Sequence, residues 1–201
     1  MNEPADKAAT YEDLMKVPDH RVAEIVDGEL LTRPRSSSTH ALASSALGTS
    51  LFDPFHRRHG KPGGPGGWWL LIEPVLHLGD DILVPDLAGW RRKRMPVFPD
   101  VPFFELAPDW VCEILSPSTV RVDRIRKLPI YAREGVGHTW LVDPRALTLE
   151  VLRLENGRWV IAAQHEGAAT VRAEPFDAVE LEMARWWPPV EDEEQADADR
   201  S

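Results

Sequence analysis

One short segment, residues 109–115 (DWVCEIL), restricts the fold of this chain most strongly. An apolar run of this length is typical of a central strand that is covered on both faces, as in α/β proteins. Alternation along the strand places Glu113 and Leu115 on one face, and Cys112 and Ile114 then lie on the other face. Burial of a carboxylate is costly unless it is paired, hydrogen-bonded or bound to a metal, so Glu113 requires a partner. The segment predicts an α/β fold with an acidic group in its interior.

The rest of the chain predicts both helices and strands around this segment. The Asp27-Gly28 pair is typical of a tight hairpin, and it lies between two short apolar runs within residues 21–34. Neither an internal repeat nor a second core is visible, so we expect one domain of mixed α/β (α+β) type over residues 10–187. The main predicted helices cover residues 36–59 and 116–134, and the predicted strands cover residues 68–78, 81–90, 109–115, 138–143, 147–154, 157–164 and 169–174.

The formal net charge of −10 argues against a nucleic-acid partner, because phosphate binding depends on Lys and Arg. The distribution of the charge weakens this argument, since residues 191–201 hold six acids and one base and so carry half of it. An acidic run without large apolar residues cannot offset the entropy cost of ordering. We therefore expect residues 188–201 to form a disordered tail and residues 1–9 to be flexible.

Composition excludes several other classes of protein. The single cysteine, Cys112, allows neither an intrachain disulfide nor a cysteine-based zinc cluster. No stretch approaches the roughly 18 to 20 apolar residues that a membrane span needs, and the N-terminus lacks the pattern of a secretory signal. These features predict a cytoplasmic protein without a membrane partner.

A second acid, Asp86, lies in a similarly apolar stretch, ILVPDLAGW. If the two strands are neighbours, Asp86 and Glu113 converge on a hard cation such as Mg²⁺, which prefers carboxylate, water and phosphate oxygens. Either acid alone could also cap a turn or pair with an arginine. On the following helix, Asp123, Lys127 and Tyr131 share one face, so that Lys127 could approach Glu113. The alternative is an ordinary surface pair between Asp123 and Lys127.

Several motifs together resemble one known family. The stretches PDL (85–87), PDWVCEILSPST (108–119), DRIRKLPIYAREGVGHTWLVDP (123–144) and LEVLRL (149–154) follow one another in this order. The N-terminal YEDL, the EIVDGEL hairpin and SSSTH fit the opening of the same family. In these motifs the chain resembles the Uma family of putative restriction endonucleases, part of the PD-(D/E)XK nuclease superfamily, over about residues 10–187.

The resemblance implies a restriction-endonuclease-like core, in which a mixed sheet is flanked by helices and preceded by an N-terminal hairpin. It implies that Asp86 and Glu113 hold Mg²⁺, with Mn²⁺ as a substitute. Glu24 and the Ile114 carbonyl complete the implied metal site, and Lys127 is the implied basic partner. The implied activity is hydrolysis of DNA phosphodiester bonds by a metal-activated water.

This chain departs from the usual superfamily pattern, in which the lysine lies two residues after the acid. That position is Leu115 here, and the resemblance implies that the lysine has moved to the next helix, at Lys127. The main alternative is a catalytically degenerate module that keeps the fold and binds nucleic acid or protein. Leu115 at the usual lysine position and the negative net charge of the chain favour this alternative. A glycoside hydrolase that uses the same two carboxylates leaves Lys127 unexplained.

Further residues are candidates for supporting roles. An exposed, apolar and Trp-rich C-terminal region would favour a homo-oligomer such as a dimer, although packing in a core or an interface is the default for Trp186 and Trp187. Cys112 is expected to be a small buried hydrophobic residue. Residues expected to support the site are His40, Glu73, Asp123 and Tyr131, although His40 could equally cap its helix and Glu73 could face solvent. Bases expected to contact nucleic-acid phosphates are Arg91, Arg92, Lys93, Arg94 and Arg124, and the alternative for the first four is a solvated loop.

Overall fold

A six-stranded sheet forms the centre of the computed structural model, which describes residues 8–34, 37–57 and 64–189. The sheet is mixed, because β7 and β8 are parallel while all other neighbouring pairs are antiparallel. This arrangement confirms the predicted fold class. In spatial order the strands are β10 (Arg158–Glu166), β9 (Thr148–Glu155), β8 (His138–Asp143), β7 (Trp110–Ile114), β6 (Leu87–Arg91) and β3 (Trp68–Ile72).

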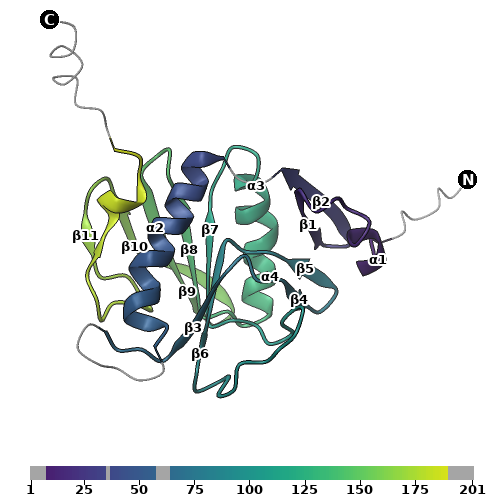
Figure 1. Ribbon diagram of the computed structural model, residues 1–201, viewed down its shortest axis with the longest axis horizontal. Helices are drawn as coiled ribbons and strands as arrows, with labels where there is room; N and C mark the ends of the chain where they lie inside the picture. The colour runs from purple at the N-terminus through teal and green to yellow at the C-terminus, as the bar shows by residue number, and fades with distance from the viewer. Residues whose placement is uncertain (1–7, 35–36, 58–63, 190–201) are drawn as a thin grey trace, which may run out of the picture.

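Helices cover both faces of this sheet (Figure 1). On one face α2 (Ser38–Phe55) packs Leu47 and Leu51 against Cys112 and Ile114 of β7. On the other face, residues such as Ile130 pack with Val111 of β7 and Trp90 of β6. β7 is therefore covered on both sides, as its apolar run predicts. The second helical segment consists of α3 (Val120–Val122), the π-helical turn η1 (Asp123–Lys127) and α4 (Leu128–Arg133).

A smaller antiparallel sheet, in the order β2-β1-β5-β4, holds the N-terminal hairpin against the main body. The hairpin turns at Asp27 and Gly28, both of which have positive φ, as the tight turn requires. Because only these two residues join the strands, the pairing starts at Val26 and Glu29, and Glu24 lies opposite Leu31. The elements are α1 (Tyr11–Leu14), β1 (Arg21–Val26), β2 (Glu29–Pro34), β4 (Leu76–Leu78) and β5 (Asp81–Leu83).

The two long strands predicted over residues 68–78 and 81–90 are wrong, because each run divides into two strands of different sheets. The divisions fall at Pro74 and Pro85, which have no backbone N–H to continue a ladder. The second division places Asp86 immediately before β6 rather than within a strand. This break puts the carboxylate at the end of the central sheet.

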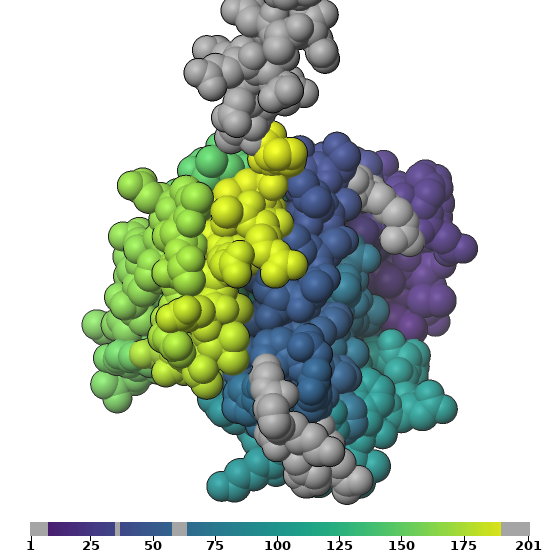
Figure 2. Space-filling view, turned by 60° about the vertical axis from the view of Figure 1, so that its left-hand side comes forward, coloured from purple at the N-terminus to yellow at the C-terminus, as the bar shows by residue number. Residues whose placement is uncertain are grey.

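The C-terminal region contradicts the expectation of an exposed, Trp-rich surface. Trp186 and Trp187 are both buried, and the Trp186 indole N–H donates a hydrogen bond of 3.2 Å to Ser50 Oγ of α2. The segment follows the short strands β11 (Thr170–Val171) and β12 (Leu181–Glu182) and forms the turn η2 (Met183–Trp186). Figure 2 shows the yellow C-terminal segment lying along blue α2. These indoles therefore complete the core and form no exposed apolar patch.

Two predicted segments fall largely outside the described residues. They are the flexible N-terminus over residues 1–9 and the disordered tail over residues 188–201, of which the structure describes only residues 8–9 and 188–189. The helix predicted over residues 36–59 ends at Phe55, and residues 58–59 are also outside the described part. Among the described helices, none has the length and apolar character that a membrane span requires.

We expect Gly89→Ala in β6 to lower the free energy of unfolding by about 1–3 kcal/mol, because the core there is already filled. An added Cβ would lie 2.8 Å from Leu70 Cδ2 and 3.2 Å from Trp110 Cε3. Urea denaturation measures the change. The control is Gly48→Ala in α2, where the nearest atom is Ile72 Cδ1 at 3.7 Å and alanine favours the helix. Equal stability of Gly89→Ala and wild type would contradict this packing.

Candidate active site

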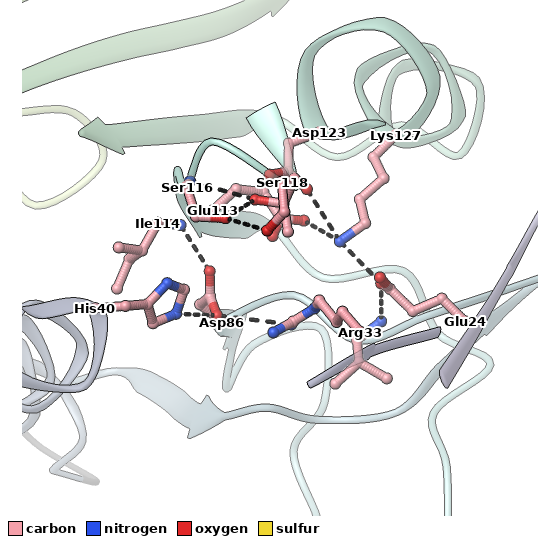
Figure 3. Close-up of polar contacts among 12 residues, drawn as sticks. Glu24, Arg33, His40, Asp86, Glu113, Ile114, Ser116, Ser118, Asp123 and Lys127 are labelled. Atoms are coloured by element: carbon pink, nitrogen blue, oxygen red, sulfur yellow. Dashed lines mark hydrogen bonds and ion pairs between the residues drawn. The ribbon is translucent and has the colours of Figure 1, made fainter. Parts of the chain in front are cut away.

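Asp86 is held by groups from two other elements (Figure 3). Its Oδ2 accepts a hydrogen bond of 2.7 Å from the Ile114 N–H of β7, and its Oδ1 lies 2.8 Å from His40 Nε2 of α2. The Glu73 N–H donates to the Asp86 carbonyl at 3.0 Å. Asp86 is 3 % exposed, so its carboxylate is stabilised by these donors and not by bulk solvent. The structure thus brings three of the predicted site residues together, namely Asp86, His40 and Ile114. A fourth, Glu73, contacts Asp86 through its backbone N–H.

Glu113 lies on β7 and points away from α2, as strand alternation requires. Its Oε1 accepts hydrogen bonds from the Tyr131 hydroxyl at 2.5 Å and from Lys127 Nζ at 3.3 Å. The predicted partners of this acid therefore lie on the helix that follows β7. Cys112, on the opposite face, is fully buried and burial raises the pKa of its thiol well above the ordinary value. It is a core residue.

Lys127 is buried among three carboxylates from three elements (Figure 3). Its Nζ lies 2.8 Å from Glu24 Oε1, 3.3 Å from Glu113 Oε1 and 3.3 Å from Asp123 Oδ1. Only 2 % of the residue is exposed. The alternative of a surface pair between Asp123 and Lys127 is therefore wrong. Burial alone would lower the pKa of Lys127, but the surrounding carboxylates, Glu113 foremost, raise it well above the ordinary value, so the amine is charged.

The π-helical turn explains how Asp123, Lys127 and Tyr131 share one side of the helix. In a regular α-helix, residues at i and i+8 differ in direction by about 80°, because each residue turns by about 100°. In η1 the Leu128 N–H donates to the Asp123 carbonyl, five residues back, and this wider turn rotates less per residue. The smaller rotation in η1 offsets part of this difference in direction. The three side chains can then all face the cluster at Glu113.

The hairpin contributes two residues to the same cluster. Glu24 Oε1 accepts a hydrogen bond of 2.8 Å from the Val84 N–H in addition to its contact with Lys127. Arg33 Nη2 lies 3.9 Å from Asp86 Oδ1. The sequence analysis missed Arg33, although the tight hairpin register pairs residue 24 with residue 31 and residue 22 with residue 33. This register places Glu24 and Arg33 diagonally on one face, which is a signal that the sequence does contain.

The cluster has more acids than bases. Among the residues that the structure describes, Glu24, Asp86, Glu113 and Asp123 face two permanent cations, Lys127 and Arg33. Burial raises the pKa of Glu113 well above its ordinary value, although the charge of Lys127 opposes this, and burial also raises the pKa of Asp123. This excess of negative charge favours the binding of a cation or a proton at the cluster.

These shifts predict a specific pH dependence of stability. The folded-state pKa of Glu113 lies above its ordinary value of 4.5, so the folded protein binds this proton more tightly than the unfolded chain. The contribution of Glu113 to the free energy of unfolding is complete below pH 4.5 and is lost as the pH rises through the folded pKa. We expect wild type to lose stability relative to Glu113→Gln in urea denaturation as the pH rises above 4.5. A difference that does not vary with pH would contradict the raised pKa.

The donor atoms suit a hard divalent cation, although their present arrangement does not enclose one. Carboxylate oxygens and an excess of negative charge are what Mg²⁺ and Mn²⁺ require. Within residues 8–34, 37–57 and 64–189, no group of three His, Cys, Asp or Glu side chains is placed to hold a metal ion. The cluster is instead bridged by Lys127, so metal binding requires the side chains to rearrange around this amine.

The predicted phosphate-contacting bases are not brought together with the acids. Arg91 is the last residue of β6, so the run of residues 91–94 lies about 16 Å along the strand from Asp86. Arg91 stacks on Trp68 and Arg92 on Trp69, while Arg94 pairs with Asp109 at 3.1 Å and Lys93 is exposed. The remaining predicted base, Arg124, is hydrogen-bonded through Nη1 to Glu150 Oε2 at 3.0 Å.

A mixed sheet with a helix on each face and a buried cluster of acids around one lysine defines a restriction-endonuclease-like α/β protein. The chain belongs to the Uma2 family, described as "Putative restriction endonuclease", whose sequence model matches residues 8–184. This match confirms the resemblance drawn from the motifs.

A solved structure shares the fold. It is a putative nuclease belonging to DUF820 from Anabaena variabilis, with a TM-score of 0.70 and 21 % sequence identity. The alignment covers 89 % of this chain and 97 % of the other. No curated protein matches the chain in sequence. At this identity the structural match establishes the fold.

Proposed function

We propose that this protein is an endonuclease that hydrolyses DNA phosphodiester bonds with the help of Mg²⁺, for which Mn²⁺ substitutes. The observation that carries this proposal is the buried cluster, in which four carboxylates outnumber the two permanent cations of the described residues. Four buried acids without a role would be a large cost to folding. Membership of a family described as putative restriction endonucleases supports the same activity.

Each residue of the cluster has a role in this proposal. Asp86 and Glu113 hold the cation, and Glu24 and the Ile114 carbonyl complete its ligands. When bound, the cation polarises the phosphate and lowers the pKa of a water molecule. Lys127 stabilises the negative charge that develops on the phosphate as the oxygen of water attacks phosphorus and the sugar oxygen leaves.

Other residues act by positioning these groups. The hydrogen bond from Tyr131 fixes the Glu113 carboxylate, and the contact with His40 fixes that of Asp86. Asp123 holds Lys127 at 3.3 Å from across the helical turn. All these contacts are buried, so they keep the carboxylates close together, and metal binding then requires the side chains to rearrange around Lys127.

A catalytically degenerate module that binds nucleic acid or protein is the second candidate. The specific observation in its favour is the bridging position of Lys127, which occupies the space between Glu24, Glu113 and Asp123. The Leu115 side chain at the usual lysine position is buried in an apolar cluster with Leu141 and Leu152. In this module Lys127 would serve only to neutralise the acids.

Metal binding and cleavage distinguish the two candidates. Calorimetric titration of the full chain with Mn²⁺ is expected to show binding by wild type and weaker binding by Glu113→Gln. Circular DNA, single-stranded and supercoiled, is expected to be cut by wild type with Mg²⁺ or Mn²⁺ and not with EDTA. Glu150→Gln, which removes a carboxylate paired with Arg124 outside the cluster, is the matched control. Wild type that binds no Mn²⁺, or equal binding by Glu113→Gln, would contradict the endonuclease.

A further inference from the structure

A cavity of about 170 Å³ opens beside the acidic cluster, between β2 and the turn that leads into α3. Its walls include Glu24 and Asp123, two of the three carboxylates that contact Lys127 Nζ. Since a water molecule takes up about 30 Å³ in the liquid, this volume corresponds to about five waters. The cavity therefore has room for a phosphate group and part of its sugar.

Arg33 is the cation that lines this cavity. Its guanidinium points toward Asp86 (Figure 3), but the distance of 3.9 Å is too long for a hydrogen bond, so the contact uses none of the Arg33 N–H donors. Burial alone would lower the pKa of Arg33, but the charges of Asp86 and Glu24 raise it above the ordinary value, and the group stays charged. A charged fork beside a small cavity is suited to a phosphate group.

Two arginines of the neighbouring helical segment, Arg124 and Arg126, already have carboxylate partners. Arg126 donates hydrogen bonds to Glu29 Oε2 at 2.7 Å and to Asp27 Oδ2 at 3.1 Å, and so fastens the hairpin to the helix. Arg124 donates to Glu150 on β9. The predicted basic run lies at the other end of β6. Binding of an intact duplex depends on bases that neutralise several phosphates at once. Within the described part of the chain, Arg124, Arg126 and the run of residues 91–94 do not supply such a surface around the cavity.

Burial of the cluster also limits which nucleic acid can reach it. Lys127 and Glu113 are each 2 % exposed, and Asp86 is 3 % exposed. A duplex would have to deform to bring one phosphate to this depth, and bending a duplex costs free energy. An unpaired strand is flexible and can turn a single phosphate inward.

We propose that this cavity binds one phosphate of an unpaired DNA strand with Arg33 as its ligand, so that single-stranded or locally unwound DNA, and not intact duplex, is the substrate class. The inference rests on the proposed function, because it takes the cluster beside the cavity to be the reaction centre. Arg33 is then a substrate-binding residue of the site.

Fluorescence anisotropy in EDTA tests the assignment without cleavage. The probes are a short labelled single strand and the same sequence as a blunt duplex, titrated with the full-length protein. We expect the single strand to bind at least about tenfold more tightly than the duplex. Arg33→Gln is expected to weaken single-strand binding by about tenfold or more, because a charge-assisted contact is lost. Arg172→Gln, which removes an exposed arginine hydrogen-bonded to the Asp177 carbonyl, is the matched control.

The outcomes separate this inference from the proposed function. Equal binding of duplex and single strand by wild type would overturn the inference whether or not the variants fold. Unchanged single-strand binding by folded Arg33→Gln would overturn it too, whereas an intermediate loss in Arg33→Lys, which keeps the charge but not the fork, would support it. If Arg33-dependent binding occurs but no DNA is cleaved with metal, the endonuclease fails while the phosphate site stands. If duplex is cleaved independently of Arg33, the reverse holds.

Discussion

Replacing Lys127 with methionine is expected to lower the free energy of unfolding by about 3–5 kcal/mol at neutral pH. Methionine keeps most of the volume of the side chain but removes the charge that faces Glu24, Glu113 and Asp123. The buried carboxylates are then left without a counter-charge, and they must either take up protons or repel one another. Urea denaturation at a fixed neutral pH measures the loss.

The same variant is expected to recover stability as the pH is lowered toward 5, since protonation neutralises the carboxylates that the amine has left. Lys16→Met, which removes an exposed lysine paired with Asp13, is the control and is expected to change stability by less than about 1 kcal/mol. At a pH where Lys127→Met is folded, cleavage is expected to be lost while affinity for Mn²⁺ is nearly intact. Full cleavage activity would show that Lys127 has no catalytic role.

Asp86→Asn is expected to reduce cleavage by about a hundredfold or more while leaving the fold intact. Asparagine has the same shape, and its carbonyl oxygen can still accept the hydrogen bond from the Ile114 N–H. Its amide can donate to the other tautomer of His40. The substitution therefore removes the negative charge that a cation requires and spares the contacts that connect β6, β7 and α2.

A matched control is available in Asp81→Asn. Asp81 is also a buried acid that accepts a backbone hydrogen bond, from the Asp27 N–H at 2.7 Å, but its cation is Arg133 and it lies outside the cluster. We expect Asp81→Asn to keep the cleavage rate of wild type per folded molecule. Comparable loss of activity in both variants would show that the effect of Asp86→Asn is structural.

Local sequence signals predicted much of the fold. The Asp-Gly hairpin, the apolar strand around Glu113 and the following helix all lie where short-range patterns place them. Each of these three elements depends on neighbouring residues alone. The hairpin depends on positive φ at its turn, the strand on alternation, and the helix on Gly135, which follows its last turn. The family assignment depended on the same stretches, because their motifs lie within these elements.

Contacts between distant segments could not be read in the same way. Arg33 approaches Asp86 only because the smaller sheet folds the hairpin over the end of β6. The basic run at residues 91–94 was expected to contact nucleic-acid phosphates, but the extended strand β6 separates it from Asp86 by its full length. For Trp186 and Trp187 the sequence left core and interface packing open, and Trp186 fills a space beside α2 that tertiary packing alone creates.

The π-helical turn at residues 123–127 means that this protein positions its lysine by the winding of a helix and not by the pleat of a strand. On a strand, a lysine two residues after the acid is fixed to the same face, and insertion of a single residue would turn it away. A wide turn is what an extra residue produces within a helix. Loss of one residue from this turn would rotate Lys127 relative to Glu113 without replacing either side chain, so that insertions and deletions, as much as substitutions, are a route by which such a site could be gained or lost in evolution.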